Sequence, residues 1–208
     1  MEKLDSIKIV KAFISEKSVE EGNPIYKIEQ EFVRWVNLHT EFFIQRYAEG
    51  RGEHWTENEL KTTRIGLSGQ LSFELLLQLL EVPYVPNAAV IDQRLTKDYD
   101  FFIPKLGKVE VKCYANYCRK VLVKPEEWHN NDYLIVWKFR EDTPNEEFGS
   151  IQLIGWLTKQ EVEATPTTPK DATKFNPYSD AKIIDMTALR NPKTFITKLQ
   201  KAKASMNQ

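Results

Sequence analysis

Apolar residues in the N-terminal quarter of the chain recur at the spacing of one helical face. Residues 24–50 contain six large apolar side chains at near-helical intervals, and this period predicts a long amphipathic helix whose main role is packing. The apolar residues are Phe32, Trp35, Val36, Phe42, Phe43 and Tyr47.

A second helix is predicted to begin after Thr56, because Glu59 follows three residues later and completes a capping box. The helix contains Gly66 and Gly69 and continues through residues 71–82, which are apolar on nearly every side. A helix of this kind is mostly buried. We expect its one polar stripe to face either water or a polar cleft; the stripe consists of Gln70, Glu74, Gln78 and Glu81.

The rest of the chain alternates short strand-like apolar runs with helical and turn signals. Segments 100–104 and 109–114 are predicted to form a hairpin around a turn at 104–108. The continuous apolar run 131–140 is typical of a strand that is covered on both faces. Further strands are expected at 88–93, 150–157 and 181–186, short helices after Pro125 and at 158–163, a capped helix at 191–204, and loops at 141–149 and 164–180.

This order of elements predicts an α/β fold, a central mixed sheet flanked by helices. The length of 208 residues suits one domain with a helical appendage. We expect residues 1–65 to form an N-terminal helical region, and residues 66–208 to form the core.

Composition and motifs exclude several classes of protein. No apolar run reaches the roughly 18 residues of a membrane span, and the N-terminus has no apolar signal core, so we expect a cytoplasmic protein without membrane contact. Cys113 and Cys118 form neither a disulfide framework nor a zinc motif. Walker, GxSxG and HExxH motifs are absent, and residues 128–132 (WHNND) lack the partner histidines of a His-Asn-His nuclease.

Charge is distributed unevenly although the net charge is only −1. Residues 1–104 carry 12 Lys/Arg and 17 Asp/Glu, a net −5, and residues 105–208 carry 17 and 13, a net +4. The basic excess gathers around the predicted hairpin and at the C-terminus. Such clusters can follow a phosphate backbone, and they are also found on ordinary solvated faces.

The predicted hairpin carries charges where a plain core strand has none. Glu110 and Lys112 lie two residues apart on one strand and therefore share a face. Asp100 opens the neighbouring strand, and the hairpin can bring its carboxylate beside Glu110. Two adjacent carboxylates repel each other, and a divalent cation such as Mg²⁺ removes that conflict.

An acid-x-Lys triplet alone carries little information, since the chain has three, at 59–61, 110–112 and 180–182. The triplet at 110–112 is the one that combines a strand context with an Asp opening the preceding strand. The alternative interpretation of this motif is a surface hairpin with a cross-strand salt bridge.

These residues resemble the PD-(D/E)xK nuclease superfamily, which has the restriction endonuclease-like fold and whose pattern is an Asp at the start of one strand followed by acid-x-Lys on the next. The matching positions are Asp100 and the triplet Glu110, Val111 and Lys112, while Tyr99 stands where the motif has Pro. The resemblance covers roughly residues 70 to 165.

The resemblance implies a role for each matching residue. Asp100, Glu110 and the main-chain carbonyl of Val111 would bind Mg²⁺, with Mn²⁺ as a substitute, and Lys112 would position or activate the attacking water. Glu74 fits the place of an additional acid from the preceding helix. Asp98 shares the face of Asp100 and is the alternative ligand.

Residues after the second hairpin strand mix basic and aromatic side chains. Such side chains beside a phosphodiester site can hold DNA by phosphate contacts and stacking. The expected DNA-binding residues are Tyr114, Asn116, Tyr117, Arg119 and Lys120. The alternative is a polar loop at a strand end.

The function implied by the resemblance is that of a Mg²⁺-dependent endodeoxyribonuclease, foremost a type II restriction endonuclease acting as a homodimer. On this reading, residues 1–65 would serve dimerisation or DNA recognition, and residues 66–208 would be the PD-(D/E)xK nuclease core. A Holliday junction resolvase and a phage or mobile-element nuclease are alternatives of the same fold. Two alternatives belong to other classes: a non-catalytic DNA-binding or assembly subunit, and a plain scaffold domain.

Overall fold

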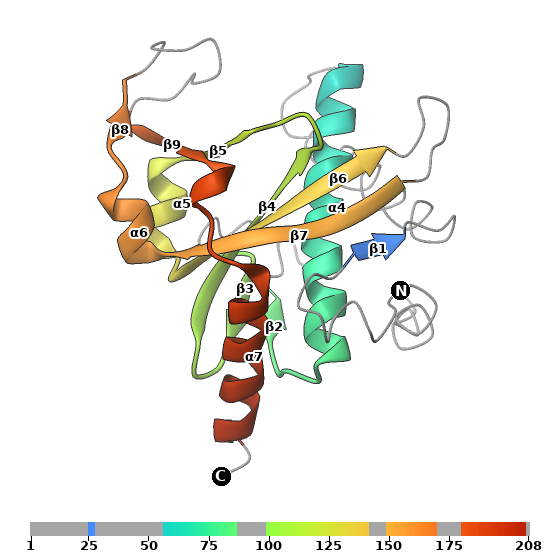
Figure 1. Ribbon diagram of the computed structural model, residues 1–208, viewed down its shortest axis with the longest axis vertical. Coiled ribbons are helices and arrows are strands. Elements are labelled where there is room, and N and C mark those ends of the chain that lie inside the picture. The colour runs from blue at the N-terminus through green and yellow to red at the C-terminus, as the bar shows by residue number, and fades with distance from the viewer. Residues whose placement is uncertain (1–24, 28–55, 87–98, 142–148, 170–179, 207–208) are drawn as a thin grey trace, which may run out of the picture.

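The computed structural model describes residues 25–27, 56–86, 99–141, 149–169 and 180–206. This part of the chain is mixed α/β, with a central sheet between helices (Figure 1). The helices are α4 (Glu57–Leu79), α5 (Pro125–Asn130), α6 (Lys159–Ala164) and α7 (Pro192–Met206), with a 3-10 turn η2 (Met186–Ala188).

The described strands form two sheets. The larger sheet has the strand order β1-β7-β6-β4-β3-β2, in which β4 and β6 are parallel and all other neighbours antiparallel. Its strands are β1 (Ile25–Lys27), β2 (Val85–Pro86), β3 (Phe101–Ile103), β4 (Gly107–Ala115), β6 (Tyr133–Glu141) and β7 (Gly149–Thr158). The smaller sheet has the order β5-β9-β8, with β5 (Lys120–Val123), β8 (Thr167–Thr168) and β9 (Ala181–Asp185).

Strand β6 lies in the middle of the larger sheet and feeds an apolar core on each side. Ile135 and Trp137 point to the core beneath α4 and α7, whereas Leu134 and Val136 point to the core beneath α5, α6 and the smaller sheet. Successive side chains of a strand face opposite sides, so the continuous apolar run predicted at 131–140 is confirmed as a strand buried on both faces.

Helix α4 begins at the predicted capping box, in which the Thr56 side chain and the Glu59 side chain each bond the backbone of the other residue. It is one uninterrupted helix, so the predicted boundary between residues 65 and 66 falls inside it. Gly69 faces β4 closely: a Cβ at this position would lie 2.5 Å from the Cβ of Cys113. The absent side chain thus lets the helix pack directly on the strand.

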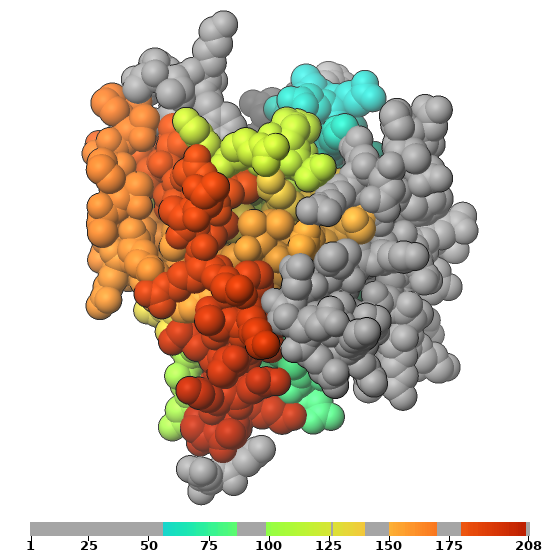
Figure 2. All heavy atoms as spheres, in the orientation of Figure 1, coloured from blue at the N-terminus to red at the C-terminus, as the bar shows by residue number. Residues whose placement is uncertain are grey.

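The C-terminal elements cover the sheet as a continuous band. Figure 2 shows the segment from β9 to α7 running along one face of the molecule. Phe195 and Leu199 of α7 join the core that α4 also covers. The helix predicted at 191–204 is confirmed, with the Asn191 side chain accepting from the Lys193 amide at 2.9 Å.

Several predicted elements need correction. Ile25–Lys27, inside the helix predicted at 24–50, is a strand paired with β7. Helix α4 ends at Leu79, so Glu81 leaves the polar stripe and instead forms an ion pair with Lys203 at 2.7 Å. The predicted polar loop after β4 is followed at once by β5, and the loop 164–180 contains β8. The strand predicted at 88–93 and most of the loop at 141–149 lie outside the described residues, as does nearly all of 24–50.

The close approach of α4 to β4 makes a testable prediction. Gly69→Ala should lower the free energy of unfolding by about 1–3 kcal/mol, because the new methyl group overlaps the Cys113 side chain. Gly66→Ala is the matched control in the same helix: a Cβ there meets nothing within 4 Å, so the variant should gain about 0.5–1 kcal/mol. Urea unfolding measures both, and equal midpoints for Gly69→Ala and wild type would contradict the prediction.

Candidate active site

Asp100 lies where the ladder between β3 and β4 ends. Its amide donates to the Val109 carbonyl at 3.0 Å, which holds the residue against β4. One carboxylate oxygen accepts from the Val111 amide and the other from the Gln70 side chain, both at 2.7 Å. The carboxylate therefore joins β4 to helix α4.

Next to Glu110 on β4, Lys112 lies between two carboxylates. Its Nζ is 2.8 Å from Glu110 Oε1 and 2.6 Å from Glu127 Oε1. The three side chains are largely buried, with exposed fractions of 21% for Lys112 and 13% for each glutamate. The hairpin thus places Glu110 and Lys112 on one face, as the period of two predicts.

Glu127 is a site residue that sequence reasoning missed. It occupies the third position of α5, where its second carboxylate oxygen accepts from the Lys124 amide at 2.8 Å. The available signal was an acidic residue three positions after Lys124, with Pro125 opening the helical turn. That pattern predicts a helix start, but it does not predict that the other carboxylate oxygen reaches β4.

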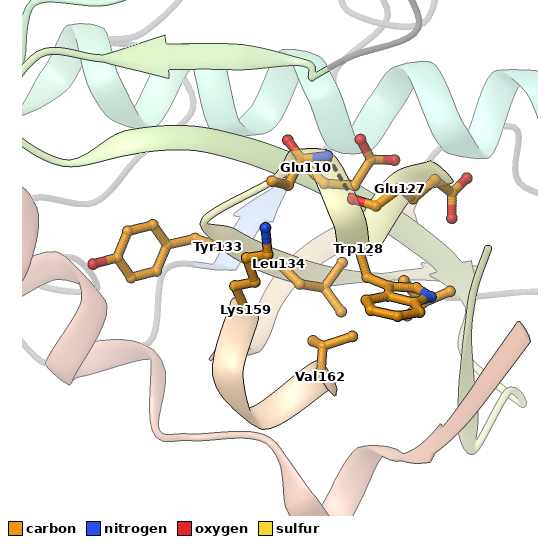
Figure 3. A pocket seen from close by; sticks show the side chains of 9 residues that line it. Glu110, Glu127, Trp128, Tyr133, Leu134, Lys159 and Val162 are labelled. Carbon is orange, nitrogen blue, oxygen red and sulfur yellow. Dashed lines mark hydrogen bonds between the residues drawn. The ribbon is translucent and has the colours of Figure 1, made fainter. Parts of the chain in front are cut away.

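Glu110 and Glu127 also line the upper end of a small pocket between α5, α6 and β6 (Figure 3). The opposite side of the pocket is formed by Leu134, Lys159 and Val162. It has room for about one water molecule. A nucleotide therefore does not fit there, and a large substrate would have to approach the carboxylates from another direction.

Burial and mutual repulsion shape the ionisation of this cluster. Burial raises the pKa of Asp100 well above its usual value, and the charge of Glu110 raises it further. Burial also raises the pKa of Glu110, an effect that Lys112 partly offsets. Burial alone would lower the pKa of Lys112, but the Glu110 and Glu127 carboxylates outweigh it and the pKa is raised. Lys112 is accordingly an ammonium group throughout the neutral range.

The cluster holds more acidic than basic groups. Asp100, Glu110 and Glu127 interact electrostatically with one another and with the ammonium of Lys112, and Glu110 also interacts with the ammonium of Lys124. Within the described segments, no three His, Cys, Asp or Glu side chains are arranged as a metal-ion site. The surplus of acidic groups nevertheless favours a divalent cation held by fewer side chains, with water completing its shell.

Among the described residues, no hydrogen bond brings Glu74 into this cluster. Its carboxylate accepts from the Tyr84 hydroxyl at 2.7 Å, and that hydroxyl accepts from the Gln78 side chain at 2.8 Å. The residue that α4 contributes to Asp100 is Gln70, one turn earlier. The polar stripe therefore splits between two partners, Asp100 and Tyr84.

The predicted DNA-binding residues have different surroundings. The Tyr114 hydroxyl donates to the Leu122 carbonyl at 3.1 Å and accepts from the Leu122 amide at 3.0 Å, so it joins β4 to β5. Burial raises the pKa of Tyr114 to about 12. The other four side chains are exposed, Tyr117 to 81%; they are Asn116, Tyr117, Arg119 and Lys120. Asp98 lies outside the described residues.

Comparison with known proteins gives no family for this chain. No family model matches the sequence. No curated protein and no solved structure matches it either. Among the helices that the structure describes, none has the length and apolar character needed to cross a bilayer.

Of the substitutions at Glu110 and Lys112, only the one at Lys112 should lower stability. At pH 8, Glu110→Gln should unfold at the same or higher urea concentration than wild type, because it removes a buried charge. Lys112→Met should lose about 2 kcal/mol or more, because it leaves two buried carboxylates unpaired.

The sign of the pH dependence follows from the raised pKa of Glu110. A folded-state pKa above the unfolded value means that wild type gains stability as pH falls through the folded pKa, down to the unfolded value of about 4.3. Any advantage of Glu110→Gln should therefore shrink between pH 8 and pH 4.5 in urea unfolding. An advantage that grew on acidification would contradict the assigned direction.

Proposed function

We propose that this chain is a Mg²⁺-dependent endodeoxyribonuclease of the PD-(D/E)xK superfamily that hydrolyses DNA phosphodiester bonds. The observation that carries the proposal is the contact of the Asp100 carboxylate with the Val111 amide, between Glu110 and Lys112 on the same strand. It brings the acid and the acid-x-Lys triplet of the motif together. The mixed sheet between helices agrees with the restriction endonuclease-like fold that the resemblance implies.

Three groups of this chain fit a divalent cation. Asp100 and Glu110 supply carboxylates whose pKa values are raised by burial and, to a lesser extent, by the neighbouring carboxylates. The Val111 amide points towards Asp100, and in a strand the carbonyl of the same residue points to the same side. Two carboxylates, one carbonyl and water form an oxygen ligand set of the kind that Mg²⁺ prefers.

The bound cation would lower the pKa of a coordinated water and offset charge on the attacked phosphate. Lys112 remains an ammonium beside Glu110, so its role is to orient the water and stabilise developing negative charge, not to accept a proton. Gln70 holds the Asp100 carboxylate in place. The resemblance implies that Glu74 would reach the metal directly or through water; in the structure it lies one turn after Gln70 and its carboxylate accepts from the Tyr84 hydroxyl.

DNA is the proposed substrate, and the loop between β4 and β5 is the proposed contact. This loop comes immediately after β4, the strand that carries Glu110 and Lys112. Its exposed side chains are those of Asn116, Tyr117, Arg119 and Lys120. A type II restriction endonuclease acting as a homodimer is the leading form of the proposal, since two sites cut two strands. A junction resolvase or a mobile-element nuclease would use the same chemistry.

One observation favours a second candidate. Lys112 forms two ion pairs, and both oxygens of Asp100 accept hydrogen bonds. These charged groups therefore have partners within the protein even without a metal ion. A non-catalytic DNA-binding or assembly subunit, or a scaffold domain, would need no more than this. In that case the charged residues contribute to stability without chemistry.

Plasmid cleavage tests the proposal. Wild type should nick or linearise supercoiled plasmid with Mg²⁺ or Mn²⁺ and should be inactive with chelator. Glu110→Ala and Lys112→Ala should lose cleavage by about two to three orders of magnitude, because each removes a group needed at the reacting phosphate. Glu163→Gln is the control, since its side chain is exposed on α6 and lies 3.9 Å from Lys159.

Folding of each variant is checked by circular dichroism. Discrete bands would point to a restriction enzyme, whereas cutting of branched DNA alone would point to a resolvase. Intact plasmid, branched DNA and RNA under every metal condition would overturn the nuclease proposal and leave the binding subunit.

DNA binding in the presence of Ca²⁺ tests the loop. Arg119→Gln and Lys120→Gln should each weaken binding and reduce the slope of log K against log salt by about 1, as expected for one lost phosphate contact. Lys193→Gln, an exposed charge change on α7, is the matched control and should leave the slope unchanged. Equal effects of all three variants would show a general charge effect and contradict a local contact.

A further inference from the structure

We propose that Glu127 is a positioning residue of this site: it anchors the Lys112 ammonium, so that the Glu110 carboxylate can bind a divalent cation. The inference rests on the proposed function and adds a residue that the PD-(D/E)xK pattern does not supply. The geometry that carries it is the position of Lys112 Nζ between two carboxylates, 2.6 Å from Glu127 and 2.8 Å from Glu110.

Two cations would compete for the Glu110 carboxylate: the Lys112 ammonium and the metal ion. Lys112 neutralises it directly, and a metal ion at the same carboxylate would compete with that ion pair and repel the ammonium. The second anion, Glu127, lets the ammonium stay in place while Glu110 turns to the metal. Without Glu127, Lys112 would depend on Glu110 alone, and metal binding would first have to break a largely buried ion pair.

Glu127 is held independently of Lys112. Its second carboxylate oxygen accepts from the Lys124 amide at the start of α5, at 2.8 Å. Its backbone carbonyl accepts from the Asn131 side chain at 2.7 Å, and Asn131 is 96% buried, with a relative exposure of 4%. The carboxylate is therefore fixed in place by α5 before it meets the ammonium, as a preorganised group must be.

Two other roles for Glu127 must be separated from this one. It could ligate the cation itself, or it could merely cap α5. A direct ligand would matter whether or not Lys112 is present, and a cap would not affect metal affinity. The proposed role requires that the effect of Glu127 pass through Lys112.

A double-mutant cycle on Mn²⁺ affinity, without DNA, decides among these roles. Free Mn²⁺ is measured by electron paramagnetic resonance for wild type, Glu127→Gln, Lys112→Met and the double variant. Glutamine keeps an oxygen for the Lys124 amide and removes the charge. Glu127→Gln should weaken Mn²⁺ binding about tenfold in wild type, but less than about twofold in Lys112→Met.

The same loss in both backgrounds would overturn the proposal in favour of a direct ligand or a general charge effect. No loss in wild type would overturn it in favour of a helix cap. Glu163→Gln should bind Mn²⁺ like wild type, and urea unfolding confirms that each variant is folded.

A cleavage measurement adds a second readout. In Glu127→Gln the metal concentration for half-maximal cleavage should rise about tenfold, with kcat at saturating metal within about twofold of wild type. A fall in kcat with an unchanged metal requirement would contradict the proposal.

Failure of the proposed function is distinguishable from failure of this inference. Wild type that binds no Mn²⁺, or binds it equally well after Glu110→Gln, would overturn both. Binding and cleavage that depend on Glu110 but not on Glu127 would overturn the role of Glu127 alone.

Discussion

The charge of Lys112 on the central sheet constrains how α5 packs on that side of the sheet. A charged group on a strand that is covered on both sides is stable only with charged partners in place. Glu110 supplies one partner from the same strand, and Glu127 supplies the other from α5. The ion pair therefore fixes α5 over β4, and α5 in turn closes the core shared by β5, β6 and β9.

The excess of buried carboxylates lowers stability, and nothing in the packing of the core requires it. Apolar residues at Asp100 and Glu110 would avoid burying charge, and burial together with repulsion raises the pKa of both acids. Groups of this kind gather at functional sites more often than in ordinary cores. The same cluster can also be a structural ion-pair network, which is why metal affinity and chemistry, and not stability, distinguish the candidates.

Local signals in the sequence predicted most elements but only part of the site. The capping box at Thr56, the hairpin around Gly107 and the buried run of β6 each depend on neighbouring residues, and all three are confirmed.

Contacts between segments distant in the sequence could not be predicted in the same way. Gln70 bonds Asp100, whereas Glu74 does not. The position of α4 on β4 determines which helical turn contacts the hairpin, and this position depends on the close approach at Gly69. Glu127 was missed for the same reason, since a helix-start signal does not reveal what the other oxygen contacts. Strand β5 was missed because four residues are too few for a clear period.

The parallel pairing of β4 with β6 has a consequence for how the chain assembles. The β3–β4 hairpin and the antiparallel pair β6–β7 each join segments close in sequence, whereas β4 and β6 pair across the crossover that contains β5 and α5. Pairing across a longer loop is the slower step in folding. Asp100, Glu110 and Lys112 belong to the first half, and Glu127 belongs to the crossover. The cluster is thus completed in the same event that joins the halves, so a chain stalled before that event would hold the motif without its last carboxylate.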